Sequence, residues 1–397
     1  MTSVLVTDGE QRAALAAVRS LGQRRRVVVL ASAPPCLAAG SRFAAAEHRG
    51  AAPLVAPVEF RSAVEDVVAR ERIDVVLPVS DAACRALLGA ELRLGATRLA
   101  GPSRAAYERL SHKGEAARLA ARVGLAVPEG AEAASLDDAL AIARSLGWPL
   151  IVKPVRSVDA EADGTLRSCG VARAGDEAAL REVWERVVGG GSALVQALVP
   201  GRGEGLFVLR WEGCTRAVFA HRRLREKPPA GGASVLCESI AVDPRLRAQV
   251  EAVLDACSFS GVAMAELRSD GRTRWLMEFN ARLWGSLQLA IDAGVDFPAL
   301  LVDAVLGEPA PPLPRYQPGI RSRWLLGDLD HALALARGAR DDSGHAGIGA
   351  ALSVLLRPSG PRCRWENPRR GDLRPFAREV RDWLRASLTA SGSRQAS

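Results

Sequence analysis

Lysine is scarce in this sequence. Three of the 53 basic residues, Lys113, Lys153 and Lys227, are lysine, and the rest are arginine. Lysine is a compact point charge on a flexible stem, whereas arginine presents a wide planar fork. A lysine in this background therefore indicates a position that a fork does not fit. Chance survival of a compositional bias is the alternative.

Aromatic residues are also few, at 5% of the chain. The net charge of +8 and the isoelectric point near 9.6 raise the question of a nucleic-acid partner. However, the arginines are scattered, and the dense run at 24–26 lies just before an apolar segment, where a solvated turn is expected. The sequence therefore does not favour a nucleic-acid binder.

Paired cysteines are missing. The seven cysteines are spread singly from Cys36 to Cys363, with no CxxC and no Cys/His spacing of a zinc site. No run of 18 apolar residues could span a membrane, and Asp8 interrupts the segment where a signal peptide needs an apolar run. We therefore expect a cytoplasmic protein without a membrane partner, and its 397 residues predict two or three domains.

The first 100 residues alternate short apolar runs with helical patterns. Strands are predicted at 3–9, 25–32 and 73–81, with helices at 12–22 and 60–72 between them. Strands separated by helices of about 10–15 residues are typical of βαβ units and a parallel sheet. The first strand is not followed by GxGxxG, so we expect a Rossmann-like half domain without a dinucleotide site.

The rest of the chain changes character twice. After two predicted helices at 112–124 and 135–147, the segment PLIVKP is typical of a strand, and a polar, glycine-bearing loop follows at 156–170. From residue 206 onward the pattern predicts antiparallel strands joined by tight turns. A proline-rich segment at 308–318 then leads into a mixed carboxyl-terminal region.

The strongest local signal is a predicted hairpin at 261–282 with Asp-Gly in its turn. Glu278 and Asn280 are two residues apart, so their side chains share one strand face, and Glu266 can pair near them across the turn. Two carboxylates and an amide oxygen are hard ligands suited to Mg²⁺. In an apolar sheet the carboxylates would repel each other unless a cation lies between them. The alternative is that they point to solvent, but the apolar residues on both faces favour a metal site.

Further features are compatible with phosphate chemistry. Lys153 ends a strand and Lys113 opens a helix, and phosphate oxygens commonly dock at both kinds of position. The loop 156–170 could fold over phosphates and exclude water. The strand 193–199 ends where backbone groups could bind adenine. Arg282 follows on the strand face of the metal ligands, and its fork suits a phosphate or carboxylate, although alone it would be one more surface arginine.

Taken in order, these residues resemble the ATP-grasp superfamily. The motifs that carry the resemblance are Lys113 at a helix start, PLIVKP, the glycine loop with GVAR, VQALVPG, and the paired strands with Glu266 and EFNAR. The resemblance covers about 105–310, and the preceding residues look like the Rossmann-like domain of that family. The segments HRRLREKPPAGGASVLCES and MEFNARLWGSLQLAIDAGVDFPALL are similar to the predicted ATP-dependent carboligases, or carboxylate–amine ligases, of the superfamily.

The resemblance implies a role for each matching residue. Lys113 and Lys153 would neutralise the phosphates of ATP. Arg282 would stabilise the transferred phosphoryl group or an acyl phosphate, so Arg282 and Lys153 are the predicted catalytic residues. The predicted ligands of Mg²⁺, with Mn²⁺ as an alternative ion, are Glu266, Glu278 and Asn280.

The nucleotide base is predicted to lie at the end of the strand 193–199. Gln196 and Leu198 would form the adenine hinge, and Glu204 would lie near the ribose. The sequence departs from the family here, because Gln196 and Ala197 stand where a glutamate often begins the hinge. It also has His112 where an aspartate often precedes the first lysine, and a solvent-facing residue at the helix start is the expected role for that histidine.

The substrate site is inferred from a basic, glycine-bearing stretch at 221–234. Arginine forks suit a carboxylate, and backbone N–H groups of the GGAS turn suit its oxygens. The alternative is a solvated charged loop. The predicted substrate residues are Arg223, Arg225, Gly232 and Ser234.

The sequence therefore predicts an α/β protein in three parts. These are a Rossmann-like domain at 1–105, an ATP-grasp domain at 106–310 with a lid subdomain at about 125–195 and an antiparallel sheet, and a proline-rich linker with a carboxyl-terminal extension at 311–397. The resemblance implies an ATP- and Mg²⁺-dependent ligase that joins a small-molecule carboxylate to an amine through an acyl phosphate. Alternatives are carboxylation with bicarbonate and a nucleotide sensor without turnover. Because ATP-grasp ligases are often dimers, a homodimer is considered as well.

Overall fold

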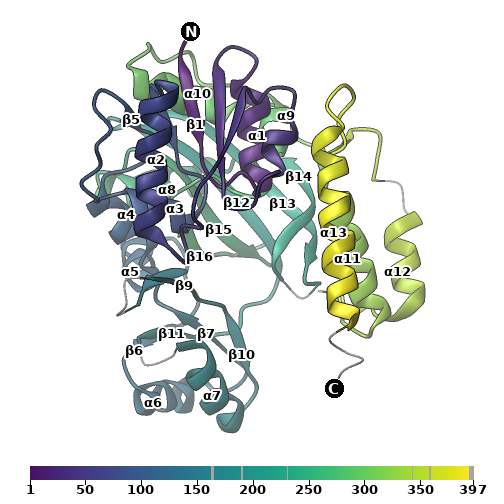
Figure 1. Cartoon of the computed structure of the whole chain (residues 1–397). Helices are drawn as coiled ribbons and strands as arrows, with labels where there is room; N and C mark the ends of the chain where they lie inside the picture. The colour runs from purple at the N-terminus through teal and green to yellow at the C-terminus, as the bar shows by residue number, and fades with distance from the viewer. Residues whose placement is uncertain (162–164, 189–190, 230, 342, 357–358, 393–397) are drawn as a thin grey trace.

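Three larger sheets, one two-stranded sheet and a group of carboxyl-terminal helices make up the described part of the molecule (Figure 1). The amino-terminal sheet lies beside one end of the largest sheet, and a smaller sheet extends away from the other end. None of the helices in the described part of the chain is long and apolar enough to cross a membrane. The computed structural model describes residues 1–161, 165–188, 191–229, 231–341, 343–356 and 359–392.

The amino-terminal sheet is parallel throughout, as predicted from its βαβ pattern. Its strand order is 3-2-1-4-5, with strands β1 (Ser3–Val6), β2 (Arg26–Ala31), β3 (Ala46–Arg49), β4 (Val75–Leu77) and β5 (Arg98–Leu99). The helices that connect or follow these strands are α1 (Arg12–Leu21), α2 (Pro57–Glu71) and α3 (Asp81–Leu87).

Alternate side chains of the parallel strands enter two different cores. Leu5 of β1 packs with Phe60 of α2 on one face of the sheet. Val4 and Val6 belong to the core that also contains α1 and one face of the largest sheet. Burial on both faces explains the nearly continuous apolar sequence of these strands.

The largest sheet has seven strands, and its order is 16-15-12-13-14-17-18. All neighbouring pairs are antiparallel except β17 with β18. The predicted hairpin around Asp270-Gly271 is present as β15 and β16. The strands are β12 (Arg202–Trp211), β13 (Cys214–Lys227), β14 (Ala233–Ile240), β15 (Gly261–Ser269), β16 (Arg274–Asn280), β17 (Arg321–Arg323) and β18 (Cys363–Trp365).

Helices cover both faces of the largest sheet. The face toward the amino-terminal domain packs on α1, α9 (Leu287–Ala293) and α10 (Phe297–Leu306). The opposite face packs on α4 (Arg104–Ser111), α5 (Lys113–Arg122) and α8 (Pro244–Ala256).

The smaller four-stranded sheet lies in the segment that was expected to form the lid. Its order is 10-7-11-6, and it has an apolar core of its own. The predicted capping box is present, because Ser135 and Asp138 satisfy each other's backbone N–H groups at the start of α6. The elements are β6 (Gly130–Ala133), α6 (Leu136–Leu146), β7 (Leu150–Pro154), β10 (Ala172–Ala174), α7 (Glu177–Val183), the π-helix η2 (Trp184–Val188) and β11 (Ala193–Ala197).

The predicted phosphate-covering loop forms a small hairpin, β8 (Val158–Ala160) with β9 (Leu166–Ser168). The residues 162–164 of that loop lie outside the described residues. The hairpin contacts the amino-terminal domain: the N–H of Leu166 donates to the carbonyl of Leu54 at 2.9 Å, and Arg85 pairs with Asp159 at 3.1 Å. The loop therefore bridges the lid sheet and the amino-terminal domain.

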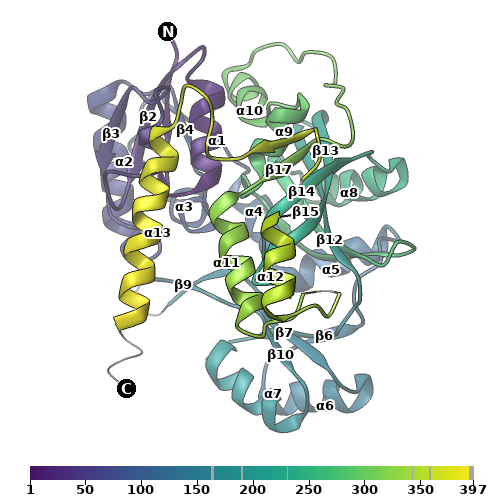
Figure 2. The same cartoon turned by 90° about the vertical axis from the view of Figure 1, so that its right-hand side faces the viewer.

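The carboxyl-terminal region is built into the rest of the molecule. It supplies β17 and β18 to the largest sheet, and it contains α11 (Leu325–Ala336), α12 (Gly347–Leu356) and α13 (Arg374–Gly392). Figure 2 shows α13 running alongside the amino-terminal domain. Buried ion pairs fasten this region to α1, with Arg12 to Glu366 at 2.8 Å and Arg19 to Asp372 at 2.8 Å.

Replacing Arg19 with methionine tests this fastening. The Arg19 guanidinium also donates to the carbonyl groups of Glu366 and Asn367 at 2.9 and 2.8 Å. Removing one partner of a buried pair leaves the other charge uncompensated, so we expect the free energy of unfolding to fall by about 3–5 kcal/mol in urea titrations. Arg181→Met, which breaks an exposed pair with Glu177, is the control, with an expected loss below about 1 kcal/mol. Equal small losses would contradict the prediction.

Candidate active site

Two glutamates lie side by side on one face of the largest sheet. Glu266 of β15 is directly opposite Glu278 of β16, and Asn280 lies two residues further along the same strand. The alternation of strand side chains places all three on one face, as the sequence predicted. Their role as metal ligands stays a prediction.

This sheet face changes from apolar to charged along its strands. Met264 precedes Glu266 on the same face, and it packs with Phe207 and Phe219 in the core against the amino-terminal domain. Glu266 and Glu278 come where that core ends and the lid sheet begins. The carboxylates are therefore partly exposed at the edge of this face rather than enclosed in the apolar core.

Two of the three lysines reach this carboxylate pair from different elements. Lys113, at the start of α5, lies 3.4 Å from Glu278 Oε2 and donates to Ser157 Oγ at 2.8 Å. Lys153 of β7 is buried with its Nζ 4.0 Å from Met277 Sδ. Burial lowers the pKa of Lys153, and the nearby negative charge of Glu278 opposes that shift.

Positive charges keep Glu278 ionised although it is enclosed by protein. Burial alone would raise the pKa of Glu278, but Lys113, Lys153 and Arg282 together hold that pKa below its usual value. Its neighbour Glu266 pairs with Arg223 of β13 at 3.0 Å. Four basic side chains thus offset the repulsion between two adjacent carboxylates.

The fork of Arg282 is held by the amino-terminal domain. Its Nε lies 2.7 Å from Asp81 Oδ2, and its Nη2 donates to Asn280 Oδ1 at 3.0 Å. Burial disfavours the charge of Arg282, but Asp81 more than offsets this effect and raises the pKa. Asp81 was not predicted as a site residue. It follows the parallel strand β4 at the carboxyl edge of the sheet, which is where ligands bind in open α/β sheets.

His112 has a structural role. Its Nδ1 accepts the N–H of Glu115 at 3.2 Å, so it is the N-cap of α5 and fixes where Lys113 lies. This position agrees with the expected place at a helix start, and the side chain is partly enclosed, at 20% exposed.

The predicted adenine hinge is only partly assembled on this face. Gln196 is buried, and its Nε2 lies 3.5 Å from the carbonyl of Pro128. Leu198 is exposed, but its N–H points to the carbonyl of Pro149 at 3.4 Å. Glu204 faces the other side of the sheet from Glu266 and pairs with Arg274 at 2.7 Å, so the structure does not bring it to the carboxylate face.

Of the predicted substrate residues, Arg223 lies beside Glu266, whereas Arg225 lies against Asp328. Arg223 contacts Glu226 at 3.1 Å and the carbonyl of Gly232 at 3.0 Å, in addition to Glu266. Arg225 has its fork on the fully buried Asp328, with two contacts of 2.7 Å, so it forms an internal ion pair, and its role in substrate binding stays a prediction.

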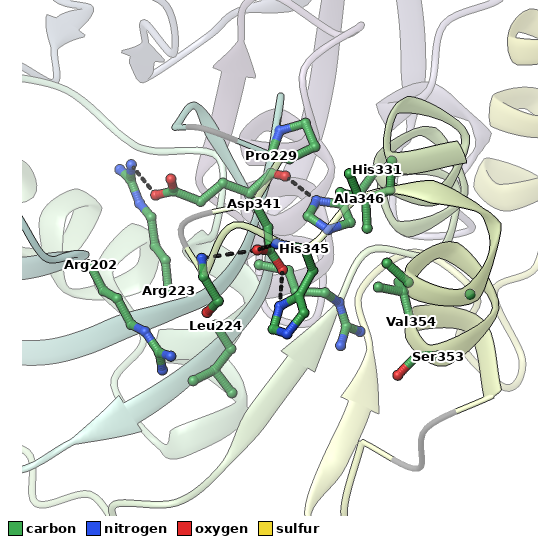
Figure 3. A pocket seen from close by; sticks show the side chains of 16 residues that line it. Arg202, Arg223, Leu224, Pro229, His331, Asp341, His345, Ala346, Ser353 and Val354 are labelled. Atoms are coloured by element: carbon green, nitrogen blue, oxygen red, sulfur yellow. Dashed lines mark hydrogen bonds and ion pairs between the residues drawn. The ribbon is translucent and has the colours of Figure 1, made fainter. Parts of the chain in front are cut away.

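The carbonyl of Ser234 accepts Arg12 Nη2 at 3.4 Å. Residue 230 of the predicted substrate loop lies outside the described residues. Two cavities flank this part of the chain. One, of about 500 Å³, lies between β13 and the helices α11 and α12 and is lined by Arg223, Arg225 and His331 (Figure 3).

The larger cavity, of about 940 Å³, contains Arg282 in its wall. It also reaches Asp8 and Asp81 at the carboxyl ends of parallel strands, and Val158 and Ser168 of the β8–β9 hairpin. The amino-terminal domain, the largest sheet, the hairpin and the carboxyl-terminal helices thus contribute to the walls of one open cavity, which Arg282 borders.

His221 is a buried residue of this region that sequence analysis assigned to a basic loop. It is fully enclosed, its Nδ1 lies 3.4 Å from Ser286 Oγ, and its ring stands edge-on to Phe207. Burial lowers the pKa of His221 to about 3, so the imidazole is neutral at physiological pH. Gly205 of β12 lies opposite His221 on one side and opposite Glu266 on the other, so the three residues form one row across the sheet.

Comparison with known proteins agrees with this architecture. The family described as "ATP-grasp in the biosynthetic pathway with Ter operon" matches residues 193–327. The formate-dependent phosphoribosylglycinamide formyltransferase of Oleidesulfovibrio alaskensis is 26% identical over 324 residues, which span 74% of this chain and 78% of that protein.

Solved structures show the same fold at low sequence identity. An N5-carboxyaminoimidazole ribonucleotide synthetase in complex with ADP is 14% identical, with a TM-score of 0.64 over 89% of this chain and 95% of that chain. Biotin carboxylase from Campylobacter jejuni, in a complex with a β,γ-ATP ligand, is 17% identical, with a TM-score of 0.61 over 78% and 72%. The fold is an ATP-grasp fold. The family match shows that residues 193–327 are also similar in sequence to an ATP-grasp family.

The neutral state of His221 predicts a pH effect on stability. Between its folded pKa of about 3 and its ordinary value of 6.5, the unfolded chain binds one more proton than the folded chain. The contribution is therefore complete above pH 6.5 and is lost as the pH falls toward 3, with a slope of up to about 1.4 kcal/mol per pH unit. Urea titrations across this range should show a shallower slope for His221→Gln, and parallel profiles would contradict the assignment.

Proposed function

We propose that the protein is an ATP- and Mg²⁺-dependent ligase that joins a carboxylate to an amine through an acyl phosphate. The observation that carries this proposal is the adjacent pair of Glu266 and Glu278, surrounded by Lys113, Lys153 and Arg282 at the charged end of this sheet face. Such a set can hold polyanionic phosphates and a divalent ion at the same place. The similarity to an ATP-grasp family and to a formate-dependent formyltransferase supports the same proposal.

The donor set fits Mg²⁺ bound with nucleotide phosphates. The part of the chain described by the structure contains no group of three or more His, Cys, Asp or Glu side chains that could hold an ion. Two facing carboxylates with an amide oxygen instead match Mg²⁺, which is often bound by one or two carboxylates together with substrate phosphates. When bound, the ion would offset negative charge on the phosphate oxygens.

In the proposed reaction, some residues neutralise charge and others hold those residues in position. In the first step the carboxylate attacks the γ-phosphorus of ATP, an acyl phosphate forms and ADP leaves. Lys113 and Lys153 neutralise phosphate oxygens, and Arg282, positioned by Asp81, stabilises charge on the transferred group. In the second step the amine attacks the acyl carbon, phosphate leaves with the bonding electrons, and the nitrogen releases a proton.

The acyl phosphate must be protected from water. The β8–β9 hairpin bridges the lid sheet and the amino-terminal domain and contributes Val158 and Ser168 to the wall of the 940 Å³ cavity. Walls of this kind limit the access of water to a reactive intermediate. We therefore place both substrates in this cavity, next to Arg282.

Replacing Glu278 with alanine tests the metal and phosphate assignment. ADP release with Mg·ATP should be measured across a panel of carboxylic acids, including formate and bicarbonate, each with and without amines. Wild-type release should require both an acid and an amine. Glu278→Ala should lose at least about 100-fold in kcat/KM, because the Mg²⁺ that offsets the phosphate charge would lose one of its proposed ligands. Full activity in a folded variant would contradict the assignment.

Replacing Lys153 with arginine tests the need for a point charge. Lys153 is buried on β7 close to Met277, where a planar fork has little room. We expect the variant to lose at least about tenfold in kcat/KM although the charge is retained, since phosphate contacts depend on position. Arg173→Lys on the neighbouring strand β10, an exposed position, is the matched control. A variant that equals the wild type would contradict the point-charge argument.

A further inference from the structure

Asp8 lies in the loop between β1 and α1 and is almost fully buried, at 9% exposed. Its backbone φ is +56°, in the left-handed region that residues other than glycine rarely adopt. On one side of it the N–H of Thr7 donates to the carbonyl of Leu77 at 3.2 Å. On the other side the N–H of Gly9 donates to the carbonyl of Leu30 at 3.1 Å. Such a conformation persists where the surrounding structure fixes it, and it is frequent at functional sites.

The carboxylate of Asp8 accepts hydrogen bonds from the turn between β4 and α3. Its Oδ2 accepts the N–H groups of Val79 at 3.4 Å and Ser80 at 3.2 Å, and its Oδ1 accepts the Ser80 hydroxyl at 2.6 Å. The Thr7 hydroxyl also donates to Oδ2. A buried carboxylate is costly unless donors satisfy it, so these four hydrogen bonds fix the turn relative to β1.

The same turn starts α3 and carries Asp81. Ser80 is the N-cap of this helix, and its Oγ accepts the N–H of Ala83 at 3.0 Å while its hydroxyl donates to Asp8. Asp81 follows directly, and its Oδ2 lies 2.7 Å from Arg282 Nε. One peptide bond therefore separates the residue that Asp8 holds from the residue that holds Arg282.

The contact with Asp81 fixes Arg282 from another domain. In the described part of the chain, Arg282 is the only hydrogen-bond donor that reaches the Asp81 carboxylate, so that carboxylate depends on its backbone for its position. The fork of Arg282 also donates to Asn280 and to the carbonyl of Leu283. If the turn shifted, Arg282 would keep, among its described hydrogen bonds, only those to residues within two positions of itself. A catalytic side chain must be held within about 0.5 Å of its productive geometry.

We propose that Asp8 is a positioning residue for Arg282. By fixing the turn before α3, it places Asp81 so that the Arg282 fork borders the 940 Å³ cavity in the orientation that phosphoryl transfer requires. This inference rests on the proposed function, because it assigns a further residue to that reaction. Asp8 acts through Asp81 and Arg282 and not on the substrate. The amino-terminal domain thus takes part in the reaction through two linked carboxylates.

Replacing Asp8 with alanine tests this role, with Asp74→Ala as the matched control. Asp74 accepts the N–H of Ser3 at 2.7 Å, so it joins the starts of β1 and β4 at the opposite edge of the same sheet. Hydroxylamine is first used with Mg·ATP and the acid panel to trap the acyl phosphate as a hydroxamate. With the acid that gives hydroxamate, kcat and KM for ATP are then measured for each variant, and urea titrations report stability.

We expect Asp8→Ala to lower kcat by at least about tenfold and to change KM for ATP by less than about twofold, because Arg282 acts on the transferred group in the transition state. Asp74→Ala should keep kcat within about twofold of the wild type, although both variants should unfold at lower urea concentrations. Asp8→Asn keeps one acceptor oxygen and should lose several-fold in kcat. It takes the place of Asp8→Ala in every comparison if alanine prevents folding.

A double-mutant cycle distinguishes positioning from a general loss of stability. Asp81→Ala removes the contact with Arg282. In that background Asp8→Ala should therefore lower kcat by less than about a further twofold, because the path through which Asp8 acts is already broken. A merely structural role would lower kcat by the same factor in both backgrounds, and that result would overturn the proposal.

The outcomes separate this inference from the proposed function. Hydroxamate formation with an unchanged kcat in the folded Asp8 variants would overturn the positioning role and leave the ligase reaction intact. Absence of both hydroxamate and ADP release with every acid in the wild type would overturn the ligase and the positioning role together.

Discussion

The arrangement of this molecule depends on the balance of charge around two neighbouring carboxylates. Glu266 and Glu278 stand opposite each other on adjacent strands, where like charges destabilise a sheet. The compensating cations come from a helix, the lid sheet, a third strand and the segment after the hairpin. Because these elements are distant in the sequence, the charge balance ties the lid and the sheet to one geometry. These are the same cations that the proposed function assigns to the phosphates of a nucleotide.

Much of the architecture could be predicted from the sequence because its signals are local. The apolar runs at 3–9, 25–32 and 73–81 predicted the parallel strands. The spacing of Glu278 and Asn280 predicted that their side chains share one face of the sheet. Strand periodicity is a property of a few consecutive residues, so pairing across a tight turn follows from it. The scarcity of lysine was informative for the same reason, as Lys113 and Lys153 both lie beside Glu278.

The rest of the site depends on which distant segments meet, and a sequence pattern does not carry that information. Arg225 was predicted as a carboxylate ligand from the basic stretch around it, whereas its ion pair with Asp328, about a hundred residues later, depends on the fold. Glu204 has the right chemistry, but the register of β12 turns it to the far face. Asp81 was not identified because its partner, Arg282, lies in another part of the fold. Each of these assignments depends on which distant side chains become partners in the fold, and the residue type alone does not determine that.

The insertion of the carboxyl-terminal strands into the largest sheet has a consequence for how the chain acquires its structure. Arg12 and Glu366 are 354 residues apart, and Arg19 and Asp372 are 353 apart. The first helix of the protein therefore cannot complete its buried contacts until nearly the whole chain has left the ribosome. Non-local contacts of this kind slow folding and leave apolar surface exposed for longer. Until then, Arg12 and Arg19 lie without their acidic partners on a helix face that is buried in the finished protein. Their charges would favour the solubility of the nascent amino-terminal domain before the ion pairs form.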